Sequence, residues 1–122
     1  MRETGSGRRV RVVVADDHPL FRIGVSRALI GSGEIEVVGE AASGPEALDL
    51  IALHRPDVAL LDIQMPKLDG IAATRMIRQL PGLNNTPILA MTANAFENDR
   101  QKCIASGMND FIPKPVDPDV LF

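Results

Sequence analysis

Short apolar runs alternate with amphipathic segments along this chain, and this alternation constrains the fold more than any other feature. The runs predict strands at residues 10–15, 35–40, 58–61, 87–91 and 110–112. Segments with helical period lie between them, at about residues 19–30, 43–54, 69–80 and 97–106. Such alternation is typical of βαβ units, which build a parallel sheet with helices on its faces. We therefore predict an α/β fold with a doubly wound, five-stranded parallel sheet in the order 2-1-3-4-5.

The apolar pattern also predicts which helix faces are buried. In the first helix the predicted core face is Phe21, Val25, Ala28 and Leu29. In the third helix it is Ala73, Met76, Ile77 and Leu80. The second helix begins with a capping box, in which Ser43 is the cap and Glu46 follows three residues later.

The two ends of the chain differ from the rest. Residues 1–9 contain no apolar segment, so we expect a disordered leader or a tag before a single domain at residues 10–122. A fifth helix would begin near residue 116, but the sequence stops at Phe122, so this helix is expected to be truncated. An uncovered apolar face would follow, and we expect either a further tail or self-association to cover it.

Composition excludes several classes of function. The net charge is −3 and the chain has four Phe but no Trp or Tyr, which argues against direct nucleic-acid binding and against base stacking. Cys103 is the single cysteine, so an internal disulfide and a cysteine-based zinc site are excluded, and a reducing cytoplasm fits. No apolar run is long enough to span a membrane.

Polar residues gather where the predicted strands end. Asp16 and Asp17 follow the first strand, Asp62 the third, Thr92 the fourth and Lys114 the fifth. In a sheet of order 2-1-3-4-5 these carboxyl ends are neighbours, so three carboxylates, a hydroxyl and an ammonium converge.

This group of side chains suits phosphoryl transfer. Carboxylates crowded together raise each other's pKa unless a cation is present, and oxygen ligands of this kind suit Mg²⁺. A metal ion and an ammonium group neutralise the charge on a phosphoryl group during transfer, and a carboxylate can itself be the nucleophile. Asp62 ends the most apolar strand, so we predict it as the phosphoacceptor.

Four segments together resemble the landmarks of response-regulator receiver domains, the CheY-like superfamily with a flavodoxin-like fold. They are Val-Val-Val-Ala-Asp-Asp-His at the first strand, Pro-Asp-Val-Ala-Leu-Leu-Asp-Ile-Gln-Met-Pro-Lys-Leu-Asp-Gly at the third, Ile-Leu-Ala-Met-Thr-Ala at the fourth and Phe-Ile-Pro-Lys-Pro at the fifth. The resemblance covers residues 10–122, and the segments have the order and spacing of that family.

The resemblance implies a role for each site residue. Asp62 would take a phosphoryl group from a histidine kinase or a phosphotransfer domain. Mg²⁺ would be held by the side chains of Asp17 and Asp62, by Asp16 through water, and by the backbone carbonyl of Gln64. The remaining implied roles are phosphate binding and switching by Thr92, Lys114 and Phe111, and control of the phosphate lifetime by Gln64 and Asn94.

The resemblance is divided between two branches. The N-terminal half is similar to NarL/FixJ-type regulators, which carry a DNA-binding output domain. The C-terminal half is similar to receivers of hybrid histidine kinases, which is the alternative. Either way the domain would be a signalling switch and not an enzyme beyond its own phosphorylation and dephosphorylation, with a homodimer through the fourth helix and fifth strand as a further partner.

Less specific interpretations remain for several residues. A Mg²⁺-dependent aspartyl-phosphate phosphohydrolase is a distant alternative. That class carries an Asp-x-Asp pair after its first strand, whereas here Asp16 is followed directly by Asp17. A flavodoxin-like cofactor carrier would need a phosphate-binding Ser/Thr/Gly loop after the first strand and a Trp or Tyr beside the flavin, and the chain has neither. His18 is more simply a surface residue at a helix entry than a metal ligand, and Phe111 is as well explained as a core residue.

Overall fold

The computed structural model describes residues 9–65, 67–92 and 97–113, with backbone alone at residues 92, 97–100 and 111–113. The predicted leader and the predicted start of a fifth helix lie outside these residues, apart from Arg9. The strands are β1 (Val10–Ala15), β2 (Ile35–Ala41), β3 (Val58–Asp62), β4 (Ile88–Thr92) and β5 (Asp110–Pro113). The helices are α1 (Pro19–Gly31), α2 (Gly44–His54), α3 (Gly70–Arg78) and α4 (Glu97–Ser106).

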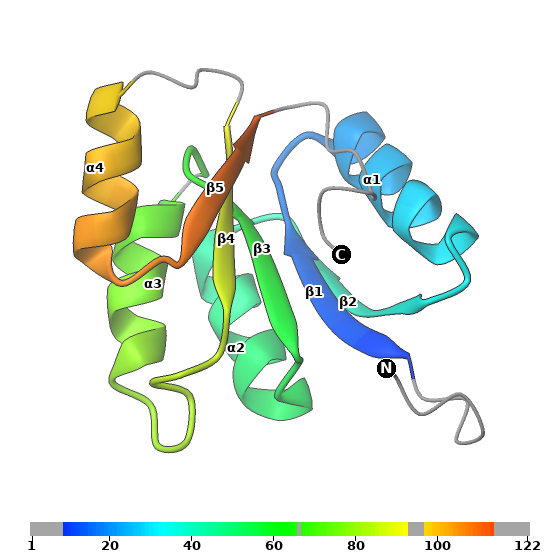
Figure 1. Cartoon of the computed structure of the whole chain (residues 1–122), viewed down its shortest axis with the longest axis horizontal. Helices are drawn as coiled ribbons and strands as arrows, with labels where there is room; N and C mark the ends of the chain where they lie inside the picture. Colours follow the sequence, from blue (N-terminus) through cyan, green and yellow to red (C-terminus); the bar gives the residue numbers. More distant parts are fainter. Residues whose placement is uncertain (1–8, 66, 93–96, 114–122) are drawn as a thin grey trace.

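The strands form one parallel sheet in the order β2-β1-β3-β4-β5, which confirms the predicted topology (Figure 1). The most apolar strand, β3, lies at the centre, as its composition predicts. The chain passes from β1 to β2 and then crosses back beyond β1 to β3. The strand order therefore reverses beside β1 and β3, and sites in open α/β sheets lie at the carboxyl ends of strands at such a point.

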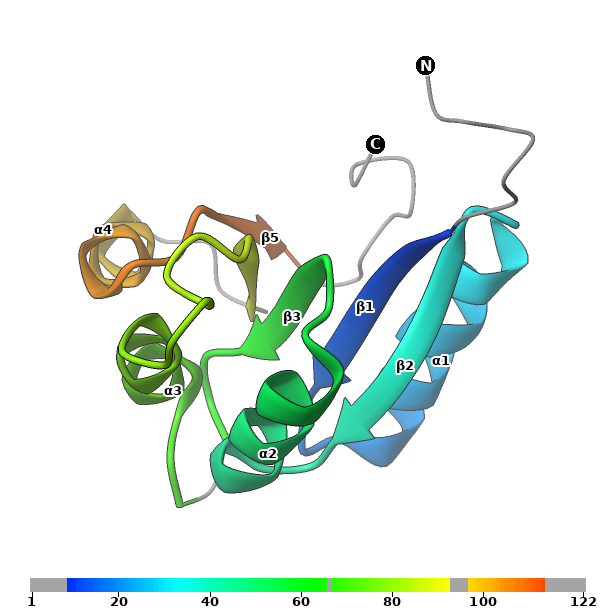
Figure 2. The ribbon, with the colours of Figure 1, turned by 90° about the horizontal axis from the view of Figure 1, so that it is seen from below.

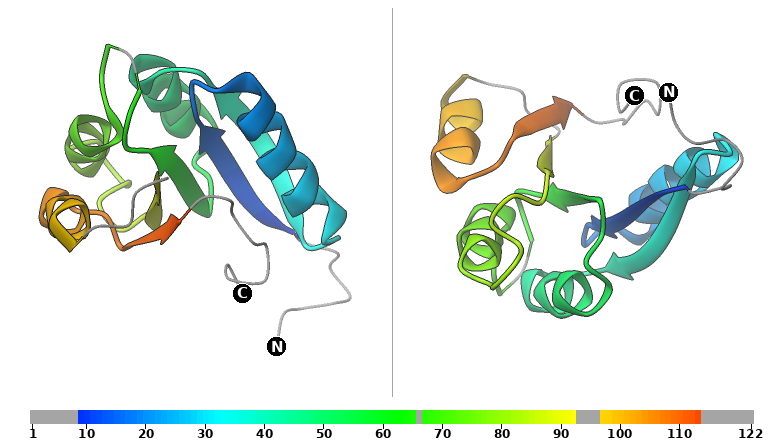
Figure 3. Two further views of the ribbon diagram at one scale, coloured as in Figure 1. Left: turned by 90° about the horizontal axis from the view of Figure 1, so that it is seen from above. Right: turned by 60° about the horizontal axis from the view of Figure 1, so that its bottom comes forward.

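Helices cover both faces of the sheet. Helix α1 packs on one face against β1 and β2, and α2 packs on the other face beside α3 (Figure 2). Helix α4 lies beside α3 and β5, at the edge of the sheet away from β2, as both views of Figure 3 show. Alternate residues of each strand supply the two cores: in β1, Val12 and Val14 point toward α1, whereas Val13 and Ala15 belong to the core under α2 and α3.

Two predicted core faces are partly wrong. Ala28 of α1 is exposed, and Ser26 is buried instead. Met76 of α3 is 48% exposed, and Thr74 is fully buried instead. Each true helix face includes a hydroxyl residue, which an apolar pattern does not count. The Thr74 hydroxyl can be buried because it donates a 2.7 Å hydrogen bond to the backbone oxygen of Gly70.

The start of α2 confirms the predicted cap at Ser43, and the start of α3 has a cap that was not predicted. The Ser43 hydroxyl accepts a hydrogen bond from the backbone N–H of Glu46, at 3.4 Å. The Glu46 carboxylate accepts one from the backbone N–H of Ala42, the residue before the cap. Asp69 caps α3 by accepting from the backbone N–H of Ala72 at 2.8 Å. The bonds from Glu46 and Ala72 use backbone donors that the first turn of a helix leaves without partners.

Candidate metal and phosphoacceptor site

The register of β1 and β3 brings the acidic residues together. Ala15 pairs with Leu61, so the residues that directly follow them in the chain, Asp16 and Asp62, lie at the same edge of the sheet. Asp16 is fully buried and Asp62 is 3% exposed. The Asp17 side chain is 34% exposed and so reaches solvent. The site therefore has a buried floor of two carboxylates and a third carboxylate at its rim.

Two tight turns orient the buried carboxylates. Oδ1 of Asp16 accepts a hydrogen bond from the backbone N–H of His18 at 2.8 Å. Oδ1 of Asp62 accepts one from the backbone N–H of Gln64 at 3.0 Å. In both cases the donor lies two residues further along the chain, which is the geometry of an Asx turn. The sequence Asp-x-His and the sequence Asp-x-Gln thus hold their own carboxylates in place.

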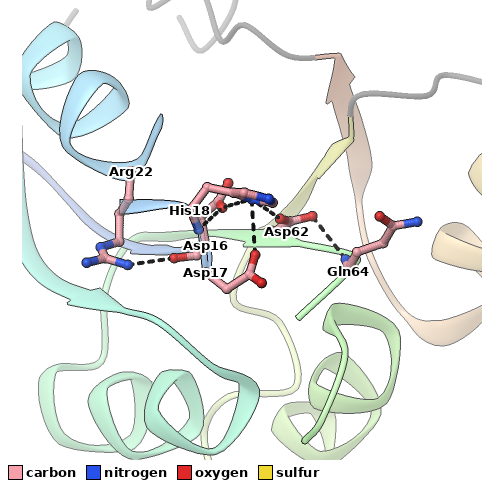
Figure 4. Close-up of polar contacts among 6 residues, drawn as sticks. All are labelled: Asp16, Asp17, His18, Arg22, Asp62 and Gln64. Carbon is pink, nitrogen blue, oxygen red and sulfur yellow. Dashed lines mark hydrogen bonds and ion pairs between the residues drawn. The ribbon is translucent and has the colours of Figure 1, made fainter. Parts of the chain in front are cut away.

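The His18 ring lies among the carboxylates (Figure 4). Its Nδ1 is 3.0 Å from Oδ1 of Asp16, 3.1 Å from Oδ1 of Asp17 and 3.9 Å from Oδ2 of Asp62. The side chain is 66% exposed, so it is a surface residue as predicted, but its polar edge faces the site. One ligand atom from each of these four residues falls within 4.8 Å of the others.

Arg22 anchors the loop that carries Asp16 and Asp17. Its guanidinium donates a 2.7 Å hydrogen bond to the backbone oxygen of Asp16. It also pairs with Glu40 of β2, with 3.3 Å between Nε and Oε1 (Figure 4 shows the Asp16 contact). Arg22 was not among the residues predicted for the site. The sequence signal that could have indicated it is its position one helical turn after His18, at the start of α1.

Helix α3 approaches the backbone of Asp62 closely. A Cβ atom added at Gly70 would lie 2.5 Å from the carbonyl oxygen of Asp62 and 3.0 Å from Cα of Ile63. A real side chain does not fit there, so the glycine lets the start of α3 pack against the end of β3. The residues that directly follow Asp62, Ile63 and Gln64, are thereby held close to the start of α3.

The donors fit a divalent cation. Carboxylate oxygens on a buried floor, with one carboxylate open to solvent, suit a hard ion such as Mg²⁺ that keeps several waters. Two buried carboxylates this close are also costly unless a positive charge lies beside them. The group of residues predicted from the strand ends of β1 and β3 is thus brought together.

The other predicted site residues are placed by their backbone or lie outside the described residues. Thr92 ends β4, one residue after Met91, which pairs with Asp62. Pro113 of β5 pairs with Thr92, and Phe111 precedes it in the same strand. Lys114 and Asn94 lie outside the described residues. The backbone register therefore leads β4 and β5 toward the same edge of the sheet as Asp62.

Comparison with known proteins identifies the family. The response regulator receiver domain model matches residues 12–122. The transcriptional regulatory protein NarL of Mycobacterium tuberculosis is 53% identical over 88 residues, which are 70% of this chain and 39% of that protein. The chain thus spans well under half the length of this relative.

Solved structures of receivers are similar to this one throughout. The signal receiver domain of M. tuberculosis NarL has a TM-score of 0.83 and 44% identity, covering 92% of this chain and 89% of that one. The receiver domain of the Pseudomonas aeruginosa sensor histidine kinase PA1611 was solved with magnesium in its active-site cleft. It has a TM-score of 0.83 and 34% identity, covering 93% of this chain and 91% of that one.

Among the helices that the structure describes, none has the length and apolar character needed to cross a bilayer.

The sheet order places carboxylates at the ends of β1 and β3 at one edge, and the family match runs through every described element from Val12 onward. This chain belongs to the response regulator receiver domain family and takes part in two-component signalling.

Proposed function

We propose that Asp62 accepts a phosphoryl group from a histidine kinase or a phosphotransfer domain, the partners with which receiver domains interact. The observation that carries the proposal is the position of Asp62 at the end of the central strand, 3% exposed and beside Asp16 and Asp17. A carboxylate is a weak nucleophile in water, but here a turn orients it and neighbouring groups are placed to bind a cation.

The transfer is an in-line displacement. An oxygen of the Asp62 carboxylate forms a bond to phosphorus while the bond from phosphorus to the donor's histidine nitrogen breaks, and the bonding electrons leave with that nitrogen. A bound Mg²⁺ ion would neutralise charge on the phosphoryl oxygens. Asp17 and Asp62 would hold it through their side chains, Gln64 through its carbonyl oxygen and Asp16 through water.

The remaining roles follow from the resemblance and from the backbone. Thr92 and Lys114 would bind the phosphate, and Phe111 would move with Thr92 on phosphorylation. The register of β4 and β5 supports this, because it brings Thr92 and Pro113 level with the end of β3. Gln64, whose side chain is exposed, and Asn94 would control how fast water removes the phosphate.

The domain would act as a cytoplasmic switch and not as an enzyme on another substrate. Similarity to NarL supports a role in transcription regulation, through a DNA-binding domain beyond this chain. The alternative is a receiver of a hybrid histidine kinase, for which PA1611 is the similar structure. We place the receiver at residues 10–122, with a leader at residues 1–9, and propose α4 and β5 as a dimerisation face.

Intact-mass measurement tests the proposal. The protein is incubated with Mg²⁺ and acetyl phosphate or phosphoramidate, and a gain of one phosphoryl group is expected. Asp62→Asn should abolish the gain, because an amide is not a nucleophile toward phosphorus. Asp49→Asn is the matched control, since Asp49 is an exposed carboxylate on α2. If the wild-type protein gains no mass with either donor, or if Asp62→Asn still gains it, the proposal is wrong.

A further inference from the structure

The metal site contains a nitrogen donor that carboxylate chemistry alone does not explain. We propose that His18 is a ligand of the bound cation, so that its ring strengthens the binding of borderline divalent ions, such as Co²⁺ and Zn²⁺, far more than the binding of Mg²⁺. The inference rests on the proposed function to the extent that both use the cation site at Asp17 and Asp62. It adds that His18 supplies a nitrogen ligand when the bound ion accepts one.

The distances around Nδ1 match a coordination shell. In an octahedral site with bonds of about 2.1 Å, ligands at right angles lie about 3.0 Å apart and opposite ligands about 4.2 Å apart. Nδ1 of His18 lies 3.1 Å from Oδ1 of Asp17, close to the right-angle spacing. It lies 3.9 Å from Oδ2 of Asp62, closer to the opposite spacing. An ion among these atoms would bind Nδ1 of the neutral ring, with the ring proton on Nε2.

The position of His18 on α1 supports this assignment. His18 is the N-cap residue of α1, yet its side chain makes no capping hydrogen bond. Residues favoured at this position are those whose side chains do cap the helix. Its backbone N–H is held by Asp16, so the residue is fixed while the ring remains 66% exposed and open to ions from solvent. The ring is therefore turned from the helix end toward the carboxylates.

The chemistry of the donor determines which ions benefit. Mg²⁺ prefers oxygen ligands and keeps much of its water, so an imidazole contributes little to its binding. Imidazole suits Zn²⁺ and neighbouring transition metals, whose affinities for mixed nitrogen and oxygen sites rise through the first row. The Asp17 and Asp62 carboxylates with His18 thus make a mixed site, in which removal of the ring lowers Co²⁺ and Zn²⁺ affinity much more than Mg²⁺ affinity.

Calorimetric titration of the unphosphorylated protein tests this inference, because it needs no phosphodonor. Co²⁺, Zn²⁺ and Mg²⁺ are titrated separately into the wild type, His18→Ala and His54→Ala. His54, at the end of α2, is the other histidine of the chain and the matched control. We expect His18→Ala to lower Co²⁺ and Zn²⁺ affinity at least about tenfold, the smallest loss usual for a group that supports a metal site. Mg²⁺ affinity should change less than about threefold, and His54→Ala should match the wild type.

A spectroscopic measurement gives a second readout. Coordination to Co²⁺ shifts the proton resonances of an imidazole far outside the usual range, and these signals should be present in the wild type and His54→Ala but absent in His18→Ala. Equal Co²⁺ affinity in His18→Ala and the wild type would overturn the inference. So would tighter binding of all three ions by His18→Ala, which would make the ring a competitor of the cation. Failure of the wild type to bind any ion would instead contradict the magnesium site of the proposed function.

Discussion

At the scale of single residues, partners decide whether a buried polar group helps or harms. Ser26 is 3% exposed on the core side of α1, and its hydroxyl has no hydrogen-bond partner among the described residues. Ser106 is 6% exposed, but its hydroxyl donates a 2.7 Å bond to the carbonyl oxygen of Cys103. The two serines are similarly buried and differ in this bond.

We expect Ser26→Ala to raise the free energy of unfolding by about 1 kcal/mol, because it removes an unsatisfied buried hydroxyl and improves helix propensity. Urea unfolding with an unchanged slope checks this value. Ser106→Ala is the control and should give no gain, because it loses a bond. A loss of stability in Ser26→Ala would show that the hydroxyl has a partner after all.

Arg22 shows how one side chain outside the carboxylate group supports the site. It joins the Asp16 carbonyl to Glu40 of β2 and so fixes the loop between β1 and α1. The Arg22 side chain is 18% exposed, whereas Glu40 is 39% exposed. The bond to the carbonyl should therefore matter more than the pair with Glu40, which solvent screens.

We expect Arg22→Met to weaken Mg²⁺ binding about tenfold, because the loop that carries Asp17 loses its anchor. Glu40→Gln keeps the Asp16 contact and should leave Mg²⁺ binding within about twofold of the wild type. Calorimetric titration of Mg²⁺ into the two variants distinguishes them. Equal weakening in both would assign the effect to the ion pair and not to the carbonyl contact.

At the scale of elements, close packing of helix starts holds the loops around the site. A Cβ atom at Gly44, the first residue of α2, would lie 1.9 Å from the carbonyl oxygen of Leu68. This contact joins α2 to the loop before α3, the same loop that follows Asp62. Gly24, within α1, is exposed, and nothing lies within 4 Å of an added Cβ.

Gly44→Ala is expected to lower the free energy of unfolding by about 3 kcal/mol, the upper range for a side chain forced into a packed site. Gly24→Ala should raise it by about 0.5–1 kcal/mol, because alanine is the better residue in an exposed helix. Thermal unfolding of both variants tests the pair. A neutral Gly44→Ala would mean that the loop at Leu68 moves away at little cost.

At the scale of the whole molecule, Arg78 connects segments that lie far apart in the sequence. From the end of α3 its guanidinium donates to the carbonyl oxygens of Leu83 and Thr86, before β4. It also donates to the carbonyl oxygen of Gly107 and to the side chain of Asn109, between α4 and β5. Partial burial lowers the pKa of Arg78 from its ordinary value, yet the group stays charged at neutral pH.

Arg78→Met should lower the free energy of unfolding by about 3 kcal/mol, because three partly buried carbonyl groups lose a charged donor. Arg75→Met, at an exposed position of the same helix, should change it by less than about 0.5 kcal/mol. Chemical denaturation measures both. If Arg78→Met were as stable as Arg75→Met, the carbonyl groups would be satisfied by water.

Local patterns in the chain were enough to predict the elements, their order and the three carboxylates that lie together. Strand and helix periods are local properties, and the strand order followed from known topology, so Asp16, Asp17 and Asp62 could be placed together before any coordinates. Coordinates were needed for two further properties. These are the rotation of each helix about its own axis and the contacts between segments that lie far apart in the sequence. The buried faces of α1 and α3 each include a hydroxyl residue, Ser26 and Thr74, and so differ from the faces that the apolar pattern predicts. The direction of the His18 ring and the reach of Arg22 and Arg78 were also decided there, because a side chain's partners are set by packing and not by its neighbours in the chain.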